Sequence, residues 1–316
     1  MPDVVVVGAG LSGLLAAKTL RAAGADVIVV DKAGGPGGRL ATRRIAAGSQ
    51  TGVFDHGAQF FTVRSDAFAR VMADWPVRVW HHGPATAAAV DKDPSSAHDG
   101  GDGHPRYVGS EGMNGIAQHL ADGLDVRVRH RVRRIREVGE GWQVDTADEA
   151  ASLRASSVLI TCPVPQAAAL VANVQMPDLT YHPCIAVLAV LDHNPVRPAV
   201  QFGDGPVHYL ADNADKGISD VPAVTVHASG PWSVAHYDDD DSAISKTLLD
   251  LVRPWLDGAG VLTTQVKRWR YSQPADPHHD PAVTVATGLV LAGDSFGQAK
   301  IEGAALSGLA AADLLG

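Results

Sequence analysis

The chain has 316 residues, of which 46% are hydrophobic and 19% are charged. This composition excludes a disordered chain and predicts a globular protein long enough for two domains that share an interface. The net charge of −9 excludes nucleic acid as a partner. Apart from the N-terminal apolar run, which forms the first strand, no apolar run is long enough to span a bilayer. Because the N-terminal apolar run lacks the basic flank of a signal peptide, we expect a cytoplasmic protein without a membrane partner.

The first 31 residues have the order strand, glycine turn, helix, strand and acid. Gly8, Gly10 and Gly13 have G-x-G-x-x-G spacing, which allows a tight turn, leaves room for a pyrophosphate and lets the helix pack on the sheet. The helix predicted over Leu11–Ala22 presents free N–H groups and a positive dipole end to the phosphates. Asp31 follows about 20 residues beyond Gly10, where a carboxylate can bind an adenosine ribose. This stretch predicts a dinucleotide site.

A glycine-rich loop, KAGGPGGRLATRR, follows Asp31. Turn N–H groups and a guanidinium can together bind a second side of the phosphates. Without its context, the loop is also consistent with a mobile segment and solvated arginines. The G-x-G-x-x-G unit, the acid and the GGR triplet together resemble the FAD-binding signature of the flavin amine oxidase and glutathione reductase type 2 superfamily. That resemblance places Arg39 near the FAD pyrophosphate.

The segment FDHGAQFFT, residues 54–62, resembles the renalase branch of that superfamily. In that branch a D-x-G-A-Q-[FY]-F-T segment lies beside the isoalloxazine ring. The resemblance therefore places Gly57, Ala58 and Gln59 near the ring, although Gln59 alone is equally consistent with a polar strand end. An amphipathic helix capped by Ser65 or Asp66 should follow.

Residues 75–104 are predicted to be irregular, with a polar and mobile excursion at DKDPSSAHDGGDGH in the substrate domain. Four histidines in this region lack ligand spacing, so we predict no metal site: His81, His82, His98 and His104. The run Asp238–Asp241 predicts the first turn of a helix rather than a calcium loop. Cys162 and Cys184 do not form a C-x-x-C pair, which favours packing in a reducing compartment over redox chemistry.

The middle of the chain returns to regular structure. A helix is predicted from about Gly112 to Ala121, followed by one strand that contains Val126, Val128, Val132 and Ile135. By resemblance to related flavoproteins, Val132 supplies a backbone contact to adenine. GWQV should continue as a hairpin strand, and SSVLIT should form a buried strand that stops at a Pro-x-Pro segment.

Residues 177–281 contain strands that predict an antiparallel sheet over the flavin, at Ile185–Leu191, Val207–Leu210, Val224–His227 and Leu262–Trp269. VHAS and KRWRYSQP resemble renalase strands that border the substrate cavity, so His227, Trp232, Trp269 and Tyr271 become candidates. Each of these side chains is also consistent with a place in the core. His227 ends a β-branched strand, where a side chain can project from a rigid sheet into a cleft. We select Gln59 and His227 as the catalytic candidates.

The closing segment predicts a strand over Gly288–Ala292, a Gly293-Asp294 turn and a small-residue helix from about Gly303. FAD needs this arrangement and NAD does not, because Asp294 can hold a ribityl hydroxyl while the helix N-terminus stabilises negative charge on a reduced flavin. An amphipathic helix without a ligand is the alternative. The predicted cofactor-binding residues are Gly8, Gly10, Leu11, Ser12, Gly13, Asp31, Lys32, Gly38, Arg39, Gly57, Ala58, Gln59, Val132, Gly293, Asp294, Glu302, Gly303 and Ala304.

The order of the motifs predicts an α/β fold, in which a Rossmann-like FAD-binding domain receives an inserted antiparallel-sheet substrate domain. We assign residues 1–62, 105–172 and 282–316 to the FAD-binding domain, and 63–104 and 173–281 to the substrate domain. FAD should be bound non-covalently, because no cysteine lies in or next to the closing segment.

The resemblance to renalases implies an oxidase that removes a hydride from a reduced nitrogen heterocycle, an isomeric dihydro-NAD(P). It implies O2 as the acceptor and hydrogen peroxide as the product. An amine oxidase, a carotenoid-type desaturase or isomerase, and a flavin-binding protein without turnover remain alternatives. Ser295 and Ala305 stand where many relatives have tryptophan, which predicts a more open pocket and leaves the substrate open. The oligomeric state is not predicted.

Overall fold

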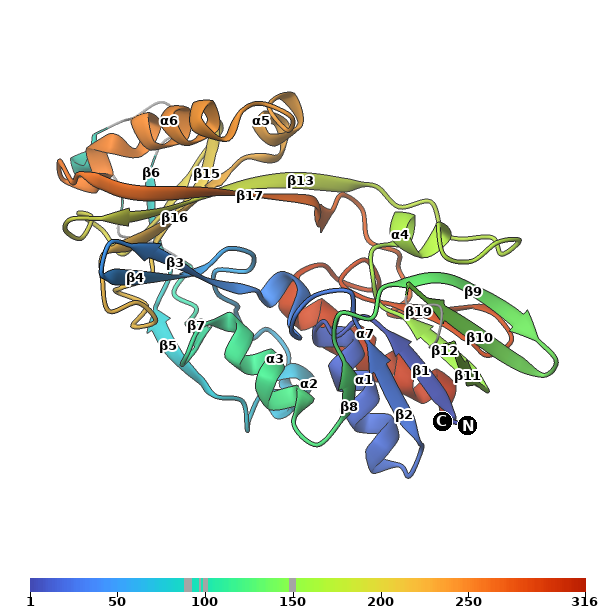
Figure 1. The fold of residues 1–316 in the computed structure, drawn as a ribbon. Helices are drawn as coiled ribbons and strands as arrows, with labels where there is room; N and C mark the ends of the chain where they lie inside the picture. Colours follow the sequence, from blue (N-terminus) through green and yellow to red (C-terminus); the bar gives the residue numbers. More distant parts are fainter. Residues whose placement is uncertain (88–92, 97, 99–101, 148–151) are drawn as a thin grey trace.

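The computed structural model describes residues 1–87, 93–96, 98, 102–147 and 152–316 (Figure 1). Its α-helices are α1 (Leu11–Ala22), α2 (Asp66–Val71), α3 (Met113–Ala121), α4 (Val164–Ala168), α5 (Gly230–Ala235), α6 (Asp241–Val252) and α7 (Lys300–Leu315). Its first strands are β1 (Val4–Val7), β2 (Val27–Val30), β3 (Thr42–Ala47), β4 (Gln50–Asp55), β5 (Val77–His81), β6 (Ala85–Ala87), β7 (Arg106–Gly109), β8 (Asp125–Arg127), β9 (Val132–Val138) and β10 (Gly141–Thr146). The remaining strands are β11 (Leu153–Ala155), β12 (Ser157–Ile160), β13 (Tyr181–Leu191), β14 (Ala199–Phe202), β15 (Val207–Asp212), β16 (Ala223–Ala228), β17 (Val261–Pro274), β18 (Ala282–Ala286) and β19 (Leu289–Ala292).

The first large sheet has the strand order β18-β19-β12-β1-β2-β8. Its central strand β1 pairs in parallel with β2 and β12. Val4 and Val6 pack with the helices α1 and α7, whereas Val5 and Val7 pack with the small sheet β11-β10-β9. Burial of both faces explains the unbroken β-branched run. The predicted α/β class with a Rossmann-like unit is confirmed, and α1 and β2 have the predicted bounds.

Residues 125–138 form two strands, so the prediction of a single strand is wrong. β8 continues the parallel sheet beside β2, while β9 pairs with β10 in the small antiparallel sheet. Arg129 between them has a φ of 60°, and its N–H donates to the carbonyl of Ala33. The chain therefore turns across the end of β2. The sequence does not reveal this turn, because apolar and polar residues alternate with the same period of two in β8 and in β9.

Three further boundaries differ from the prediction. The stretch predicted as irregular contains β5, which pairs with β7, and β6, which adds an edge to the second large sheet beside β14. The predicted mobile excursion lies partly outside the described residues. Helix α6 begins at Asp241, after the predicted start at Asp238, because Asp240 is its N-cap and accepts the N–H of Ser242. The last helix begins at Lys300, before the predicted Gly303.

The second large sheet has the order β17-β13-β16-β15-β14-β6 and lies above the β3-β4 hairpin in Figure 1. Helix α6 covers one face, where Ile244 and Leu248 join a core with the sheet residue Val187. On the other face Leu188 and Val190 pack against Phe54 of the hairpin. This sheet is antiparallel except at the β14-β6 edge. Among the described residues, no helix has the length and apolar composition needed to cross a membrane.

The contact between α1 and α7 predicts that Gly308→Ala destabilises the protein. A Cβ at Gly308 would lie 2.4 Å from the carbonyl oxygen of Ser12, so the two helices must separate. We expect a loss of about 1 to 3 kcal/mol in the free energy of unfolding, measured by urea denaturation. Gly115→Ala is the matched control, because its Cβ, in the first turn of α3, would meet only an ordinary contact at 3.7 Å. Equal stability of the two variants would contradict the close packing of α1 on α7.

Candidate functional site

The N-terminus of α1 faces open space. Helix α1 begins after Gly10 and has no side chain that caps its first N–H groups, which belong to Leu11, Ser12 and Gly13. A Cβ at Gly10 would meet no atom within 4 Å, whereas a Cβ at Gly13 would lie 2.1 Å from the carbonyl oxygen of Gly8. Gly13 is thus required by packing, and the space at Gly10 is free for a phosphate.

The carboxylate of Asp31 is held in place by two backbone N–H groups. Oδ2 accepts from Ala9 and Oδ1 accepts from Ala33, each at 2.7 Å. Both oxygens keep lone pairs for a diol. Next to Asp31 lies a cavity of about 390 Å³, whose lining includes Gly8, Asp31, Lys32, Val132, Cys162 and Gln166. The donor set and this space fit the adenosine half of FAD.

The structure joins Arg39 to Asp294, two residues predicted to contact different parts of the cofactor. Nη1 donates to Oδ2 and Nη2 donates to Oδ1, both at 2.6 Å. Gly38 and Gly293 precede these residues with positive φ values of 54° and 143°. Burial raises the pKa of Asp294, and the guanidinium of Arg39 opposes that change. The pair connects the glycine-rich loop to the end of β19.

The start of α7 is fixed by contacts to two other segments. Glu302 Oε2 accepts the N–H of Arg64 at 2.8 Å, and the carbonyl of Ala304 accepts Ser12 Oγ at 2.7 Å. A Cβ at Gly303 would lie 1.7 Å from the carbonyl oxygen of Gln298, so this position requires glycine. The predicted residues 302–304 therefore position the helix whose N-terminus would face the flavin.

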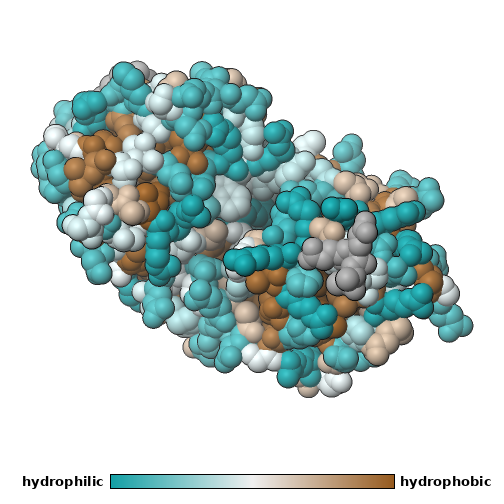
Figure 2. Space-filling model, viewed as in Figure 1, coloured by the Kyte–Doolittle hydropathy of each residue, from teal (hydrophilic) through white to brown (hydrophobic). Residues whose placement is uncertain are grey.

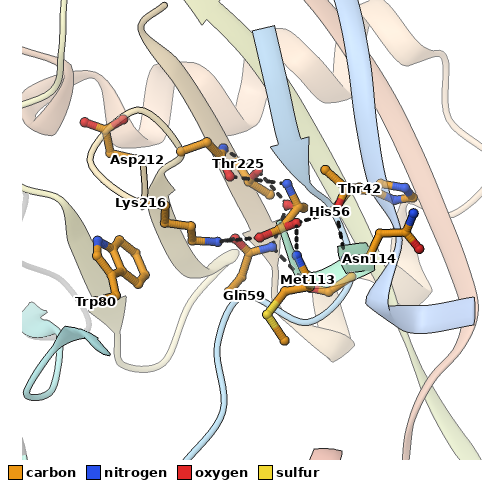
Figure 3. Close-up of polar contacts among 12 residues, drawn as sticks. Thr42, His56, Gln59, Trp80, Met113, Asn114, Asp212, Lys216 and Thr225 are labelled. Atoms are coloured by element: carbon orange, nitrogen blue, oxygen red, sulfur yellow. Dashed lines mark hydrogen bonds and ion pairs between the residues drawn. The ribbon is translucent and has the colours of Figure 1, made fainter. Parts of the chain in front are cut away.

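A buried polar network surrounds Asp55, and Figure 3 labels its members Thr42, Gln59, Met113, Lys216 and Thr225. Its Oδ1 accepts from Thr42 Oγ1 at 2.7 Å and from the N–H of Met113 at 2.9 Å, at the start of α3. Its backbone carbonyl accepts from Gln59 Nε2 at 2.7 Å and from Thr225 Oγ1 at 2.9 Å. One residue thus connects β3, α3, β16 and the segment predicted to lie beside the ring.

Lys216, which the sequence did not indicate, is fully buried beside this network. Its Nζ donates to Gln59 Oε1 at 2.7 Å and lies 3.6 Å from Asp55 Oδ2 and 5.1 Å from the ring centre of Trp80. The separation of 3.6 Å makes the contact with Asp55 an ion pair rather than a hydrogen bond. Burial raises the pKa of Asp55 and lowers that of Lys216 to about 8, and each charge opposes the change in the other.

The structure brings the two catalytic candidates together. Gln59 Nε2 lies 3.4 Å from His227 Nε2, and His227 Nε2 lies 3.3 Å from the carbonyl oxygen of His56. Because Lys216 can only donate, it fixes which end of the Gln59 amide is the oxygen. The hydrogens of Gln59 then point to the Asp55 and Gly57 carbonyls, so we assign the His227 proton to Nε2, which donates to His56. Burial lowers the pKa of His227 to about 3.

His56 and Trp269 form an aromatic pair on the side of the second sheet that also carries His227. Trp269 Nε1 donates to the His56 carbonyl at 2.8 Å, and the two rings are stacked with centroids 5.1 Å apart. Burial lowers the pKa of His56 to about 4. His56 also joins the site through the predicted turn, since it precedes Gly57 and Ala58. The Ala58 N–H donates to the Arg39 carbonyl at 2.9 Å.

The remaining candidates lie elsewhere. Trp232 packs with the core under α6 and stacks on His236, so it is separate from this group. Tyr271 lines the cavity beside Asp31. Ser295 and Ala305 are buried, and Ser295 Oγ lies 2.5 Å from Tyr181 Oη. The more open pocket expected from these two positions stays a prediction.

The sequence matches two family profiles. Residues 6–84 match the NAD(P)-binding Rossmann-like domain, and residues 84–315 match the flavin containing amine oxidoreductases. The chain is also similar to lysine-specific histone demethylase 1 homolog 1 of Arabidopsis thaliana, with 51% identity over 47 residues. That match covers 15% of this chain and only 6% of the plant protein.

Solved structures of similar fold cover nearly the whole chain. A putative protoporphyrinogen oxidase from Exiguobacterium sp. 255-15 has a TM-score of 0.77 at 12% identity. Wild-type putrescine oxidase bound to putrescine has a TM-score of 0.73 at 14% identity, and cyclohexylamine oxidase from Brevibacterium oxydans IH-35A has 0.73 at 15%. Each comparison covers 99% of this chain and 98% of the other. At these identities the likeness shows the fold.

The buried ion pair predicts that Lys216→Met destabilises the protein strongly, because it leaves Asp55 buried without a countercharge. We expect a loss of about 3 to 5 kcal/mol in the free energy of unfolding at pH 7. The double variant Asp55→Asn/Lys216→Met should regain part of this loss, since no unpaired charge remains. Lys246→Met is the control, because Lys246 is 80% exposed in its pair with Asp250. An equal, small effect of Lys216→Met and Lys246→Met would show that the buried pair does not hold the site together.

Proposed function

Since the chain belongs to the family of flavin-containing amine oxidoreductases, we propose that this FAD-dependent oxidoreductase is a renalase-like oxidase of a reduced nitrogen heterocycle, an isomeric dihydro-NAD(P). When bound, FAD accepts a hydride from such a substrate and passes the two electrons to O2, which leaves as hydrogen peroxide. The protein must hold the cofactor, orient the donor and exclude water.

Several groups are suited to holding FAD non-covalently. The open N-terminus of α1 at Gly10 would bind the pyrophosphate, and the fixed carboxylate of Asp31 would bind the adenosine ribose. The cavity that Val132 lines would bind the adenine. Arg39 and Asp294 would contact the middle of the cofactor, where each already has the other as a counterion. The start of α7 would stabilise negative charge on the reduced ring.

The weak basicity of the two site imidazoles favours a heterocycle over an amine. An amine binds as an ammonium and must lose a proton before a hydride can leave, whereas a dihydronicotinamide needs no proton removal. The pKa values of His227 and His56 are lowered to about 3 and about 4, so neither ring is a useful base near neutral pH. Lys216 has a pKa lowered to about 8, so it stays mostly protonated at neutral pH, where it is buried and engaged with Gln59 and Asp55. The weak basicity of His227 and His56 carries the proposal.

We assign the orientation of the substrate to His227 and Gln59. Lys216 and the Asp55 carbonyl fix the Gln59 amide, and His227 Nε2 is engaged with the His56 carbonyl. The second nitrogen of His227, Nδ1, then carries a lone pair and can accept from the N–H of a substrate carboxamide. Gln59 therefore acts as a positioning residue, and His227 contacts the substrate.

Anaerobic mixing of the FAD-loaded enzyme with separate donors tests this proposal. We expect 2- and 6-dihydro-NAD(P) to bleach the flavin absorbance rapidly, because they transfer a hydride without loss of a proton. Amines such as putrescine and cyclohexylamine should leave the spectrum unchanged. Bleaching by amines alone would establish an amine oxidase instead, and a spectrum that no donor changes would indicate a flavin-binding protein without turnover.

His227→Ala should slow the reduction of the flavin without loss of the cofactor. The missing hydrogen bond is expected to raise the barrier by about 1 to 3 kcal/mol, or roughly 5- to 150-fold in rate. Flavin content and melting temperature are measured on the same sample. His236→Ala is the control, since His236 stacks on Trp232 away from this group. Normal kinetics in a flavin-loaded variant would remove His227 from the site, and a joint loss of flavin and stability would return it to the core.

The low pKa of His227 also predicts a pH-dependent stability. An unfolded chain restores the ordinary pKa of 6.5, whereas the folded pKa is about 3, so protons bind the unfolded state first as the pH falls. The stability that comes from burying His227 in its neutral form is fully present above pH 6.5 and is lost as the pH falls toward 3. Wild type should therefore lose stability faster than His227→Gln, by about 1.4 kcal/mol per pH unit in this window. Parallel curves from pH 6.5 to 4 would show that His227 is not buried in its neutral form.

A further inference from the structure

Two cationic side chains, Lys267 and Arg43, lie on the face of the second sheet that also carries His227. Lys267 and His227 both pair with Ala186, from opposite sides, so the three residues form one row across β17, β13 and β16. Gln265, Lys267 and Trp269 alternate along β17 and share this face. Arg43 of β3 reaches the same face, because its Nε donates to Gln265 Oε1 at 3.2 Å. Lys267 and Arg43 therefore lie close together beside the aromatic pair of His56 and Trp269.

The positive charge of these two residues is not balanced. No salt bridge joins Lys267 or Arg43 to an acid in the part of the chain that the structure describes. The acid that acts on Lys267 is Asp241, whose carboxylate already pairs with Arg268 at 2.6 Å. After burial, Lys267 and then Arg43 lower the pKa of His56, so both charges act on one point. In a chain with a net charge of −9, this is a local positive field.

His56 supplies a second observation that points to a ligand. His56 is only 9% exposed, and its Nδ1 is buried without a hydrogen-bond partner among the residues that the structure describes. A buried polar atom of this kind costs free energy unless another molecule completes its bonding. The ring stacks on Trp269, which is half-buried and offers an aromatic surface next to the two cations.

We propose that Lys267 and Arg43 form an anion-binding subsite that takes the phosphate groups of the hydride donor, beside the aromatic pair of His56 and Trp269. The phosphates of FAD belong to the N-terminus of α1, so this subsite serves a second molecule. The donor is thereby a phosphorylated heterocycle, and a cationic amine is repelled. The identity of the donor rests on the proposed function, whereas the preference for an anion does not.

The first test measures the binding of inorganic pyrophosphate to the FAD-loaded enzyme by calorimetry at low salt. Lys267→Met and Arg43→Gln should each weaken binding about tenfold, as expected for the loss of one charge-assisted bond. Arg44→Gln is the matched control, because Arg44 follows Arg43 and its side chain points to the opposite face of β3. Flavin content and melting temperature confirm that each variant is folded. Unchanged affinity in the double variant, or an equal loss in Arg44→Gln, would overturn the subsite.

The second test compares two donors in anaerobic reduction, a dinucleotide and an uncharged N-substituted dihydronicotinamide. The double variant Lys267→Met/Arg43→Gln should raise the half-saturating concentration of the dinucleotide 10- to 100-fold and leave that of the uncharged donor unchanged. Equal changes for both donors contradict the proposal. If neither donor reduces the flavin, the proposed function fails, and the pyrophosphate titration alone decides the subsite.

Discussion

The buried ion pair between Asp55 and Lys216 is the contact on which the arrangement of the site depends. The carboxylate of Asp55 receives the first N–H of α3 and the hydroxyl of Thr42, while its carbonyl receives Thr225 from the second sheet. Lys216 compensates this charge and fixes the amide of Gln59. Because two buried charges are costly to separate, the β3-β4 hairpin and α3 are held against the second large sheet at the point where the site forms. Figure 2 shows a hollow between the second large sheet and the part of the molecule that contains the first.

A site with this construction suits the proposed hydride transfer, because its two imidazoles are weak bases. His56 and His227 are neutral because burial opposes the charged form, and one carbonyl, that of His56, bonds both His227 and Trp269. The positive charges of the site are carried by neighbouring side chains and not by the imidazoles. Lys216 acts on His227, and Lys267 and Arg43 act on His56. Hydride transfer needs a fixed geometry and a charged environment more than a base, which is why we propose this reaction for the site.

The sequence predicted the parts of the fold that depend on local patterns. The run Val4–Val7, the glycines of the first turn and Asp31 each have a local reason for their place, so the parallel sheet and α1 followed from spacing. Gln59 and His227 were each selected for the site, Gln59 through resemblance and His227 also through its place at a strand end, but their mutual contact was not predicted. Contacts between distant segments gave no such signal. Lys216 is a lone lysine in a polar loop, and only folding shows that its charge is buried beside Asp55. Arg39 and Asp294 were predicted separately. Their ion pair forms only when the glycine-rich loop packs against the end of β19, 255 residues away in sequence.

The pH dependence of the reduction rate tests the central claim most directly. The measurement is anaerobic stopped-flow reduction of the FAD-loaded enzyme by 6-dihydro-NAD between pH 5 and 7, below the pKa of about 8 of Lys216. Because both imidazoles stay neutral and Lys216 stays charged in this range, and the donor loses no proton, the rate should be constant. A rate that rises with an apparent pKa between 5 and 7 would mean that a base in the site removes a proton, and it would contradict the account.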